Sequence, residues 1–512
     1  MPFYGSIEPN KSADKGKNDD DEQWNKNYED EGNSALDSID STLRQFLLEK
    51  SKEFTLPFDA DSGYRATALQ LTSFARPHMR AFHGSWMCFC CAWLVWFSMA
   101  PLLPIVAETM SIDKSQLWTS NVWSLAGTIV LRLLLGPLCD EHGGREILIF
   151  LLVICSIPCG LAGLLIHDYF SLVVVRIWMG CVGGTLVPAQ FWITSHFAPE
   201  VSGVAMATAT GWGALGGGLA QILMGSILYP NLLRLLHGNV DLAWRVALIF
   251  PAVASLSVAA FFYYYSDDAP LGNFPIVKKA GLMKNRSAVA SFRSGICNMN
   301  AWILFVQFGA GLGIELTVDS GMTMHLVDRF DSLTIPQASS YASLFGLTNL
   351  FARGLGGWLS DRLHRSFSLP GRLAIHMALM VCEGILILSF VQAKSLSCTI
   401  FFMTCFAIAG QMSIGTCFGI VPYLDPRSTG TIAGIVAAGG NVGGVILSNI
   451  FRSEPDLTAF TVMGWYCLLA ACMTPCIMVA GYNSLLFGRQ QGGKGGITST
   501  EPQTLLTPHV VP

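Results

Sequence analysis

The sequence predicts an all-α polytopic membrane protein with twelve transmembrane helices in two six-helix halves. Of its 512 residues, 52% are hydrophobic and only 13% are charged, whereas soluble domains carry about 25% charged residues. Mean hydropathy is +0.47. The apolar residues gather in about twelve stretches, each near the roughly 20 residues that a helix needs to cross a bilayer. Two sequence patterns occur once in the first part of the chain and again in the second, which indicates the division into halves.

Polar segments separate these stretches into two groups. The predicted organisation is a largely disordered cytoplasmic tail (1–80), an N-terminal six-helix half (81–265), a cytoplasmic linker (266–300), a C-terminal six-helix half (301–485) and a second cytoplasmic tail (486–512). The first tail is acidic and has no apolar signal-peptide core. The linker is basic, and Lys and Arg accumulate on the same side as both tails, which places both termini in the cytoplasm. We expect an integral protein of the plasma membrane.

The first repeated pattern places Arg, Gly and Asp four residues apart. It reads Arg132-Leu-Leu-Leu-Gly-Pro-Leu-Cys-Asp140 in the first half and Arg353-Gly-Leu-Gly-Gly-Trp-Leu-Ser-Asp361 in the second. This spacing lines one face of a helix. At about 1.5 Å per residue, each arginine lies roughly 12 Å from the aspartate, near the middle of a hydrocarbon core about 30 Å thick.

Two arginines at the membrane midplane, one from each half, suggest a clamp for a small anion. A charged side chain at this depth is costly and commonly marks a substrate or ion path. Planar guanidinium groups can donate paired hydrogen bonds to the oxygens of a planar anion. The alternative is a structural role, in which Arg132 and Arg353 pair with buried carboxylates or reach toward an interface. The duplicated spacing favours contact with substrate.

The second repeated pattern is rich in glycine. Gly-Trp-Gly-Ala-Leu-Gly-Gly-Gly in the fifth stretch is echoed by Gly-Gly-Asn-Val-Gly-Gly in the eleventh. Small residues let membrane helices approach closely, so packing is one role. We give equal weight to a second role, in which the glycines form a sliding surface between moving halves and expose backbone toward the substrate. The motif glycines are Gly213, Gly216, Gly217, Gly440, Gly443 and Gly444.

These repeats resemble the parallel duplication of the major facilitator superfamily, whose substrates bind at the midplane between the halves. Several segments narrow the resemblance: Phe74-Ala-Arg-Pro-His-Met-Arg before the first stretch, Gln307-Phe-Gly-Ala-Gly-Leu-Gly-Ile-Glu-Leu-Thr-Val-Asp319, Phe418-Gly-Ile-Val-Pro-Tyr423 and the second glycine motif. From about residue 54 to 485 the chain is similar to the nitrate/nitrite porter family, in its plant and algal high-affinity form.

The resemblance implies import of nitrate, and also of nitrite, by alternating access with co-transport of protons. Its other implied partners are the lipid bilayer and a single-span accessory protein, which some plant relatives need. The candidate substrate-binding residues are Arg132, Arg353, Asn441, Gln190 and Phe308. Glu315 is a candidate for proton coupling, with a gate or ion-pair network as its alternative. A cytoplasmic charge lock, meaning polar contacts that hold helix ends together, is expected from Asp140, Arg145 and Asp361.

The chain departs from the family pattern at four positions near the anion. Ala214 stands where the family has Asn, Phe308 where it has Tyr, and Leu312 and Leu186 where it has Phe. These changes remove polar or aromatic groups, which leaves the identity of the anion open. Two alternatives therefore stand beside nitrate import: a nitrate sensor on the same fold, and a porter of another small monovalent anion. No nucleophile–base pair, metal cluster or cofactor motif suggests an enzyme, and nothing suggests a nucleic-acid partner.

Overall fold

The computed structural model describes residues 49, 51–60, 63–273, 295–424, 429–479 and 481–486. Most of both predicted tails and most of the predicted linker lie outside these ranges. The side chain of Asp140 also lies outside the described part, although its backbone belongs to a helix. In the described residues the architecture is helical apart from one small hairpin.

The N-terminal half begins with the hairpin and continues as helices. The elements are β1 (Phe58–Asp59), β2 (Arg65–Ala66), α2 (His78–Phe97), η1 (Ala100–Leu102), α3 (Leu103–Met110), α4 (Lys114–His142), α5 (Gly144–Gly160), α6 (Ala162–Leu165), α7 (Tyr169–Cys181), η2 (Val182–Thr185), α8 (Leu186–His196), α9 (Pro199–Ala220), η3 (Gln221–Leu228), α10 (Tyr229–Leu235), α11 (Val240–Ala247) and α12 (Ile249–Tyr265). The segment η3 is a π-helix that continues α9.

The C-terminal half has fewer and longer helices. They are α15 (Met299–Arg329), α16 (Ile335–Leu347), η4 (Thr348–Leu350), α17 (Ala352–Gln392), α18 (Leu396–Leu424), α19 (Thr429–Ser453), α20 (Asp456–Ala471) and η5 (Thr474–Cys476). Within α17, Ser368 has φ 57° and ψ −147°. This break separates two of the predicted membrane spans, which α17 would otherwise join.

The predicted twelve spans are recovered as helices or runs of helices. Among the described residues, nine helical segments are long and apolar enough to cross a membrane, and one of them, Ile335–Gln392, has 58 residues and contains two predicted spans. The remaining two predicted spans correspond to α4 and to α5, which has only 17 residues. The last helix, α20, ends at Ala471 and is followed by a 3-10 turn that contains Pro475.

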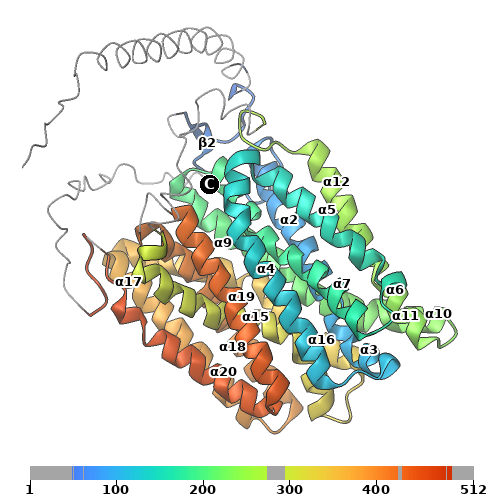
Figure 1. Cartoon of the computed structure of the whole chain (residues 1–512). Coiled ribbons are helices and arrows are strands. Elements are labelled where there is room, and N and C mark those ends of the chain that lie inside the picture. The colour runs from blue at the N-terminus through green and yellow to red at the C-terminus, as the bar shows by residue number, and fades with distance from the viewer. Residues whose placement is uncertain are drawn as a thin grey trace, which may run out of the picture.

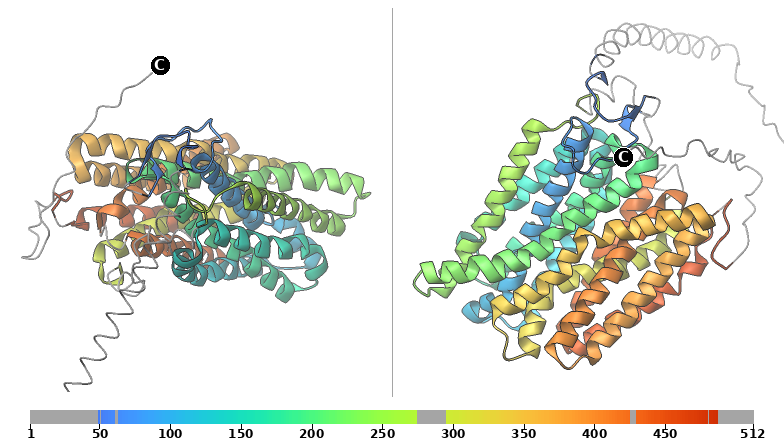
Figure 2. Two further views of the ribbon diagram at one scale, coloured as in Figure 1. Left: turned by 90° about the horizontal axis from the view of Figure 1, so that it is seen from above. Right: turned by 180° about the vertical axis from the view of Figure 1, so that it is seen from behind.

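The two halves lie side by side, with the blue-to-green helices forming one bundle and the yellow-to-red helices the other (Figure 1; Figure 2). They meet where α4 packs against α19, and where α9 and η3 pack against α16 and α17. Within the halves, α2 packs on α9 and α15 packs on α19. The same helix pairing thus occurs in each half, as the duplicated sequence predicts.

Ion pairs join the halves at one end of the bundle, here named the Lys114 end. Lys114, at the start of α4, lies 2.7 Å from the carboxylate of Asp328 and 3.0 Å from that of Asp456, both in the C-terminal half. Deeper in the bundle, Asn121 donates a hydrogen bond to Ser448 at 3.0 Å. These contacts close the two halves against each other at the Lys114 end.

The motif glycines allow the close helix crossings. A Cβ placed on Gly216 would lie 2.1 Å from the carbonyl oxygen of Cys90 on α2, and one on Gly443 would lie 2.2 Å from that of Gly309 on α15. Other motif glycines face the opposite half: a Cβ on Gly217 would lie 2.5 Å from Asp319. Packing within each half therefore has a structural basis, and Gly217 lies at the contact between the halves. The sliding surface and the exposure of backbone to substrate stay predictions.

The N-terminal tail is shorter than the predicted 1–80. Strands β1 and β2 pair antiparallel, and Ala66 forms a parallel bridge with Phe197 at the end of α8. Leu56 and Ala66 are buried in a small apolar cluster with residues of α2, α8 and α9. Apolar burial against the helices therefore orders residues 51–60 and 63–77, which the polar composition alone did not indicate.

Glycine packing yields a direct test on α19. Gly443→Ala should lower the thermal unfolding temperature, because overpacking a close contact costs about 1–3 kcal/mol. Gly434 on the same helix is the matched control, since a Cβ there meets nothing within 4 Å. Gly434→Ala should leave stability unchanged or slightly higher, because Ala favours a helix over Gly. Equal melting temperatures for the two purified variants would contradict this account of the motif.

Candidate functional site

Arg132 is buried in the middle of α4 and is 1% exposed. Its Nη2 donates to the carbonyl oxygen of Gly183 at 3.0 Å, in η2 of its own half. Its Nη1 donates to the carbonyl oxygen of Ala437 at 2.7 Å, on α19 of the other half. Within the described residues, these carbonyl groups are its hydrogen-bond partners and no carboxylate pairs with it. The guanidinium charge is therefore buried without a neutralising anion.

Arg353 is the counterpart in the C-terminal half and is 2% exposed. It forms an ion pair with Glu315 on α15. Its Nε donates to Oε1 of Gln411 on α18 at 2.8 Å, and its Nη1 donates to the carbonyl oxygen of Thr210 on α9 at 3.3 Å. The structural alternative raised by the sequence, a buried carboxylate partner, thus applies to Arg353 and not to Arg132.

The two arginines bridge the halves in a symmetric manner. Thr210 directly precedes the first glycine motif, and Ala437 stands two residues before Gly439 in the second. Each arginine therefore donates to a backbone carbonyl at the entrance of the opposite half's glycine motif. A substrate that binds these guanidinium donors would replace their bonds to the opposite half. It would therefore change the contact between the halves.

Two tryptophans of α2 lie between the arginines. The Arg353 guanidinium carbon lies 5.9 Å from the ring centroid of Trp93. The ring centroids of Trp93 and Trp96 are 6.1 Å apart, and Trp96 packs against Gly183, whose carbonyl oxygen binds Arg132. The indole Nε1 of Trp93 is buried and has no hydrogen-bond partner among the described residues. This pair was not among the predicted site residues, and its only signal in the sequence is an aromatic-rich first span.

The other predicted substrate contacts are Asn441, Gln190 and Phe308, and both amides among them have buried polar atoms without a described partner. Asn441 is fully buried on α19, one turn after Ala437 and on the same face, and both atoms of its amide lack a partner in the described structure. Gln190 on α8 likewise has a buried Nε2 without a described partner. Phe308 packs edge-to-face on Phe418, with ring centroids 4.9 Å apart. Unpaired buried amides are costly, which is consistent with groups reserved for a ligand.

Two apolar and two acidic residues of the seventh predicted span form one stripe on α15. Phe308, Leu312, Glu315 and Asp319 follow helical spacing, and all four are buried. Asn349 Nδ2 donates to Glu315 at 2.9 Å, so this carboxylate is held by both Arg353 and an amide. Neither Asn349 nor Gln411 was among the predicted site residues. Their signal was a lone amide within an otherwise apolar span.

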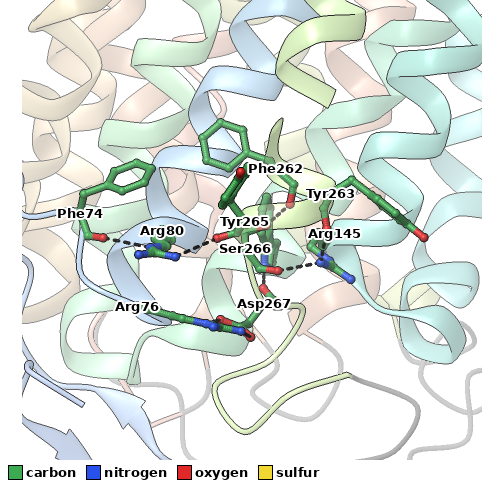
Figure 3. A network of polar contacts seen from close by, with 10 residues as sticks. Phe74, Arg76, Arg80, Arg145, Phe262, Tyr263, Tyr265, Ser266 and Asp267 are labelled. Atoms are coloured by element: carbon green, nitrogen blue, oxygen red, sulfur yellow. Dashed lines mark hydrogen bonds and ion pairs between the residues drawn. The ribbon is translucent and has the colours of Figure 1, made fainter. Parts of the chain in front are cut away.

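The predicted charge-lock residues lie at the end of the bundle opposite Lys114. The Nη1 atom of Arg145 donates to the carbonyl oxygens of Tyr263 and Ser266 at 3.1 and 2.7 Å, where α12 ends (Figure 3). Asp361 forms an ion pair with Arg372 at 2.7 Å. Because the Asp140 side chain lies outside the described part, the full lock stays a prediction.

Further arginines pin the same end of α12. Arg76 forms an ion pair with Asp267 at 2.6 Å, and Arg80 donates to the carbonyl oxygen of Tyr265 at 3.3 Å (Figure 3). The hydrogen bond and charge of Asp267 hold the pKa of Arg76 above its ordinary value. The N-terminal segment is therefore tied to the last helix of its own half.

Metal chemistry finds no support in the described residues. No group of three or more His, Cys, Asp or Glu side chains is placed there to hold an ion. The geometry instead offers guanidinium groups, amides and aromatic rings in a buried setting. Such groups can bind and orient a small anion, and none of them is arranged as a nucleophile with its base.

Comparison with known proteins agrees with the family predicted from the motifs. The family model described as Major Facilitator Superfamily matches residues 85–448. The high affinity nitrate transporter 2.5 of Arabidopsis thaliana is 33% identical over 428 residues, which cover 82% of this chain and 84% of that relative. Nitrate transporter 2.1 of Chlamydomonas reinhardtii is 33% identical over 400 residues, covering 77% and 72%.

Solved structures support the fold. A bacterial homolog of the human lysosomal transporter Spinster, in an inward-facing and unoccupied conformation, superposes with a TM-score of 0.56 at 16% identity. The match covers 78% of this chain and 96% of that chain. The twelve-helix fold and the absence of an enzyme activity follow from membership in this superfamily of transporters. The chain belongs to the Major Facilitator Superfamily and, within it, to the family of plant and algal high-affinity nitrate transporters.

Proposed function

We propose that this protein imports nitrate by proton-coupled alternating access, and that it also imports nitrite because it discriminates weakly between the two anions. The observation that carries the proposal is the unequal pair of buried arginines. Arg132 and Arg353 contribute two guanidinium charges, and Glu315 neutralises one of them. The remaining positive charge suits one monovalent anion, and planar guanidinium groups suit a planar one. The names of the relatives supply nitrate as that anion.

Orientation and coupling follow from charge. The excess of Lys and Arg in the linker and near both tails supports cytoplasmic termini, so the closed Lys114 end would face the outside. We place the protein in the plasma membrane, because import of an external anion requires a transporter there. Entry of an anion against a negative interior costs about 2.3 kcal/mol per 100 mV. Uphill uptake therefore needs a co-transported cation, for which the family implies protons, and Glu315 remains a candidate for their binding.

Uptake of labelled nitrate is the primary test. We expect cells that lack their own nitrate transporter to accumulate the label when they express this chain, and to do so faster at acidic external pH. The assay needs a surface-expression measurement and, if uptake is low, co-expression of a single-span accessory protein. A nitrate sensor on the same fold would reach the surface and bind nitrate without net uptake. That outcome would overturn import.

The arginine pair predicts a loss of binding on conservative substitution. Arg132→Lys and Arg353→Lys keep the charge but lose the planar fork, and each should weaken apparent nitrate affinity by about tenfold or more, or ~1.4 kcal/mol. Replacement of either arginine by Ala should abolish transport in a protein that still reaches the surface. Arg234→Lys, at an exposed position on α10, is the matched control. Wild-type uptake kinetics in both clamp Lys variants would assign the arginines a purely structural role.

The departures from the family pattern predict loose selectivity between small anions. Leu186, Ala214 and Leu312 are all buried at positions where the family carries aromatic or amide groups, so the arginine charges carry more of the binding. Charge alone discriminates poorly between small anions. Competition by nitrite, chlorate and formate against labelled nitrate should therefore be stronger than in relatives with the full pattern. The triple variant Ala214→Asn, Leu186→Phe and Phe308→Tyr should reduce nitrite competition by about tenfold. A native chain that already excludes nitrite, with no change in the triple variant, would refute this account.

A further inference from the structure

Asp319 is a buried carboxyl that the anion site described above does not use. It lies on α15 one turn beyond Glu315 and is 2% exposed. Glu315 is bonded by Arg353 and Asn349, whereas Oδ2 of Asp319 has no hydrogen-bond partner among the described residues. Two neighbouring carboxyls on one helix face are therefore held in different ways. Glu315 has the partners of an ionised carboxylate, and Asp319 lacks them.

Asp319 lies where the two halves contact each other. Its Oδ2 lies against Gly217 of α9, 2.5 Å from where a Cβ would stand. Its backbone carbonyl accepts a hydrogen bond from Nε2 of Gln221 in η3 at 2.7 Å, and Thr323 donates to the other end of that amide at 2.7 Å. The carboxyl is thus enclosed by the opposite half when the Lys114 end is closed.

Charge around Asp319 is well defined. Among the residues that the structure describes, the charged groups that act on it are Glu315 on its own helix and Arg353 on α17. From the opposite half, η3 and α9 present Gln221 and Gly217, neither of which titrates. Another buried carboxyl, Glu383, is bonded by Ser413 on α18 and Cys467 on α20. An ionised Asp319 in the closed state would be buried without a donor, which is strongly unfavourable.

We propose that Asp319 is the proton-binding group of this transporter, and that closure of the Lys114 end over bound substrate requires its neutral form. With Asp319 ionised, the two arginines and two carboxylates carry no net charge. Protonation leaves one net positive charge beside the anion site. Proton and anion should therefore strengthen each other's binding, and this reciprocity is the thermodynamic basis of co-transport. The inference rests on the proposed proton-coupled import and assigns to Asp319 the part considered above for Glu315.

Nitrate binding to the purified full-length protein tests the inference, with thermal stabilisation by nitrate as the readout at a series of pH values. Wild-type affinity should fall as pH rises through the titration of Asp319, by up to about tenfold per pH unit, the limit for one linked proton. Asp319→Asn, a mimic of the neutral form, should bind nitrate with little pH dependence. In proteoliposomes this variant should exchange nitrate across the membrane yet fail to accumulate it when a pH gradient is imposed.

Glu315→Gln is the matched control, because it neutralises a carboxyl one turn away. It removes the partner of Arg353, so it should change nitrate affinity at every pH while retaining the wild-type pH slope. Asp319→Ser provides a second neutral variant with a smaller side chain. If either Asp319 variant folds and keeps the wild-type slope and uphill accumulation, the inference is wrong.

The remaining outcomes also decide the matter. Failure of both Asp319 variants to fold would contradict the inference, since the closed state is inferred to contain a neutral group there. A wild-type protein that binds nitrate with no pH dependence would overturn it too. A wild-type protein that neither binds nor transports nitrate would overturn the proposed function itself, and the inference with it.

Discussion

The arrangement of this transporter depends on two buried arginines that donate to backbone carbonyls of the opposite half. Arg132 reaches Ala437 on α19, and Arg353 reaches Thr210 on α9. A guanidinium group cannot be deprotonated in a protein and is costly to bury, so each must keep its donors occupied. In this structure the carbonyls at the start of the glycine motifs supply that need. A bound anion would compete for the same donors, which links substrate binding to the fit between the halves.

Close helix packing makes these bonds attainable. The carbonyls lie next to glycines that let α9 approach α2 and let α19 approach α15 without side chains between the backbones. Two glycines of these motifs face the opposite half instead: Gly217 lies against Asp319, and Gly444 lies against Leu125. Small residues therefore serve two contacts, one fixed within each half and one that must open during alternating access.

Asymmetry within the duplicated frame gives the site its charge. Arg353 is paired with Glu315, which also accepts a hydrogen bond from Asn349, whereas Arg132 has only carbonyl partners among the described residues. A fully paired site would hold an anion weakly, and two unpaired arginines would be very costly without a ligand. One compensated and one uncompensated arginine is an intermediate solution that suits a monovalent anion. Lys114 with Asp328 and Asp456 adds a more exposed connection, which contributes little on its own and can open readily.

The sequence by itself determined the number of spans, the duplication and the family, because hydropathy and helical spacing are local properties. It did not determine which groups meet across helices. Arg132 and Ala437 are 305 residues apart, and Glu315 and Arg353 are 38 apart on different helices. Ordering of residues 51–60 and 63–77 likewise depends on contact with the helices, including Phe197. Only the packed structure decided that one arginine has a carboxylate partner, and that Asp319 is enclosed by the opposite half, because spacing along a chain fixes no distance between helices.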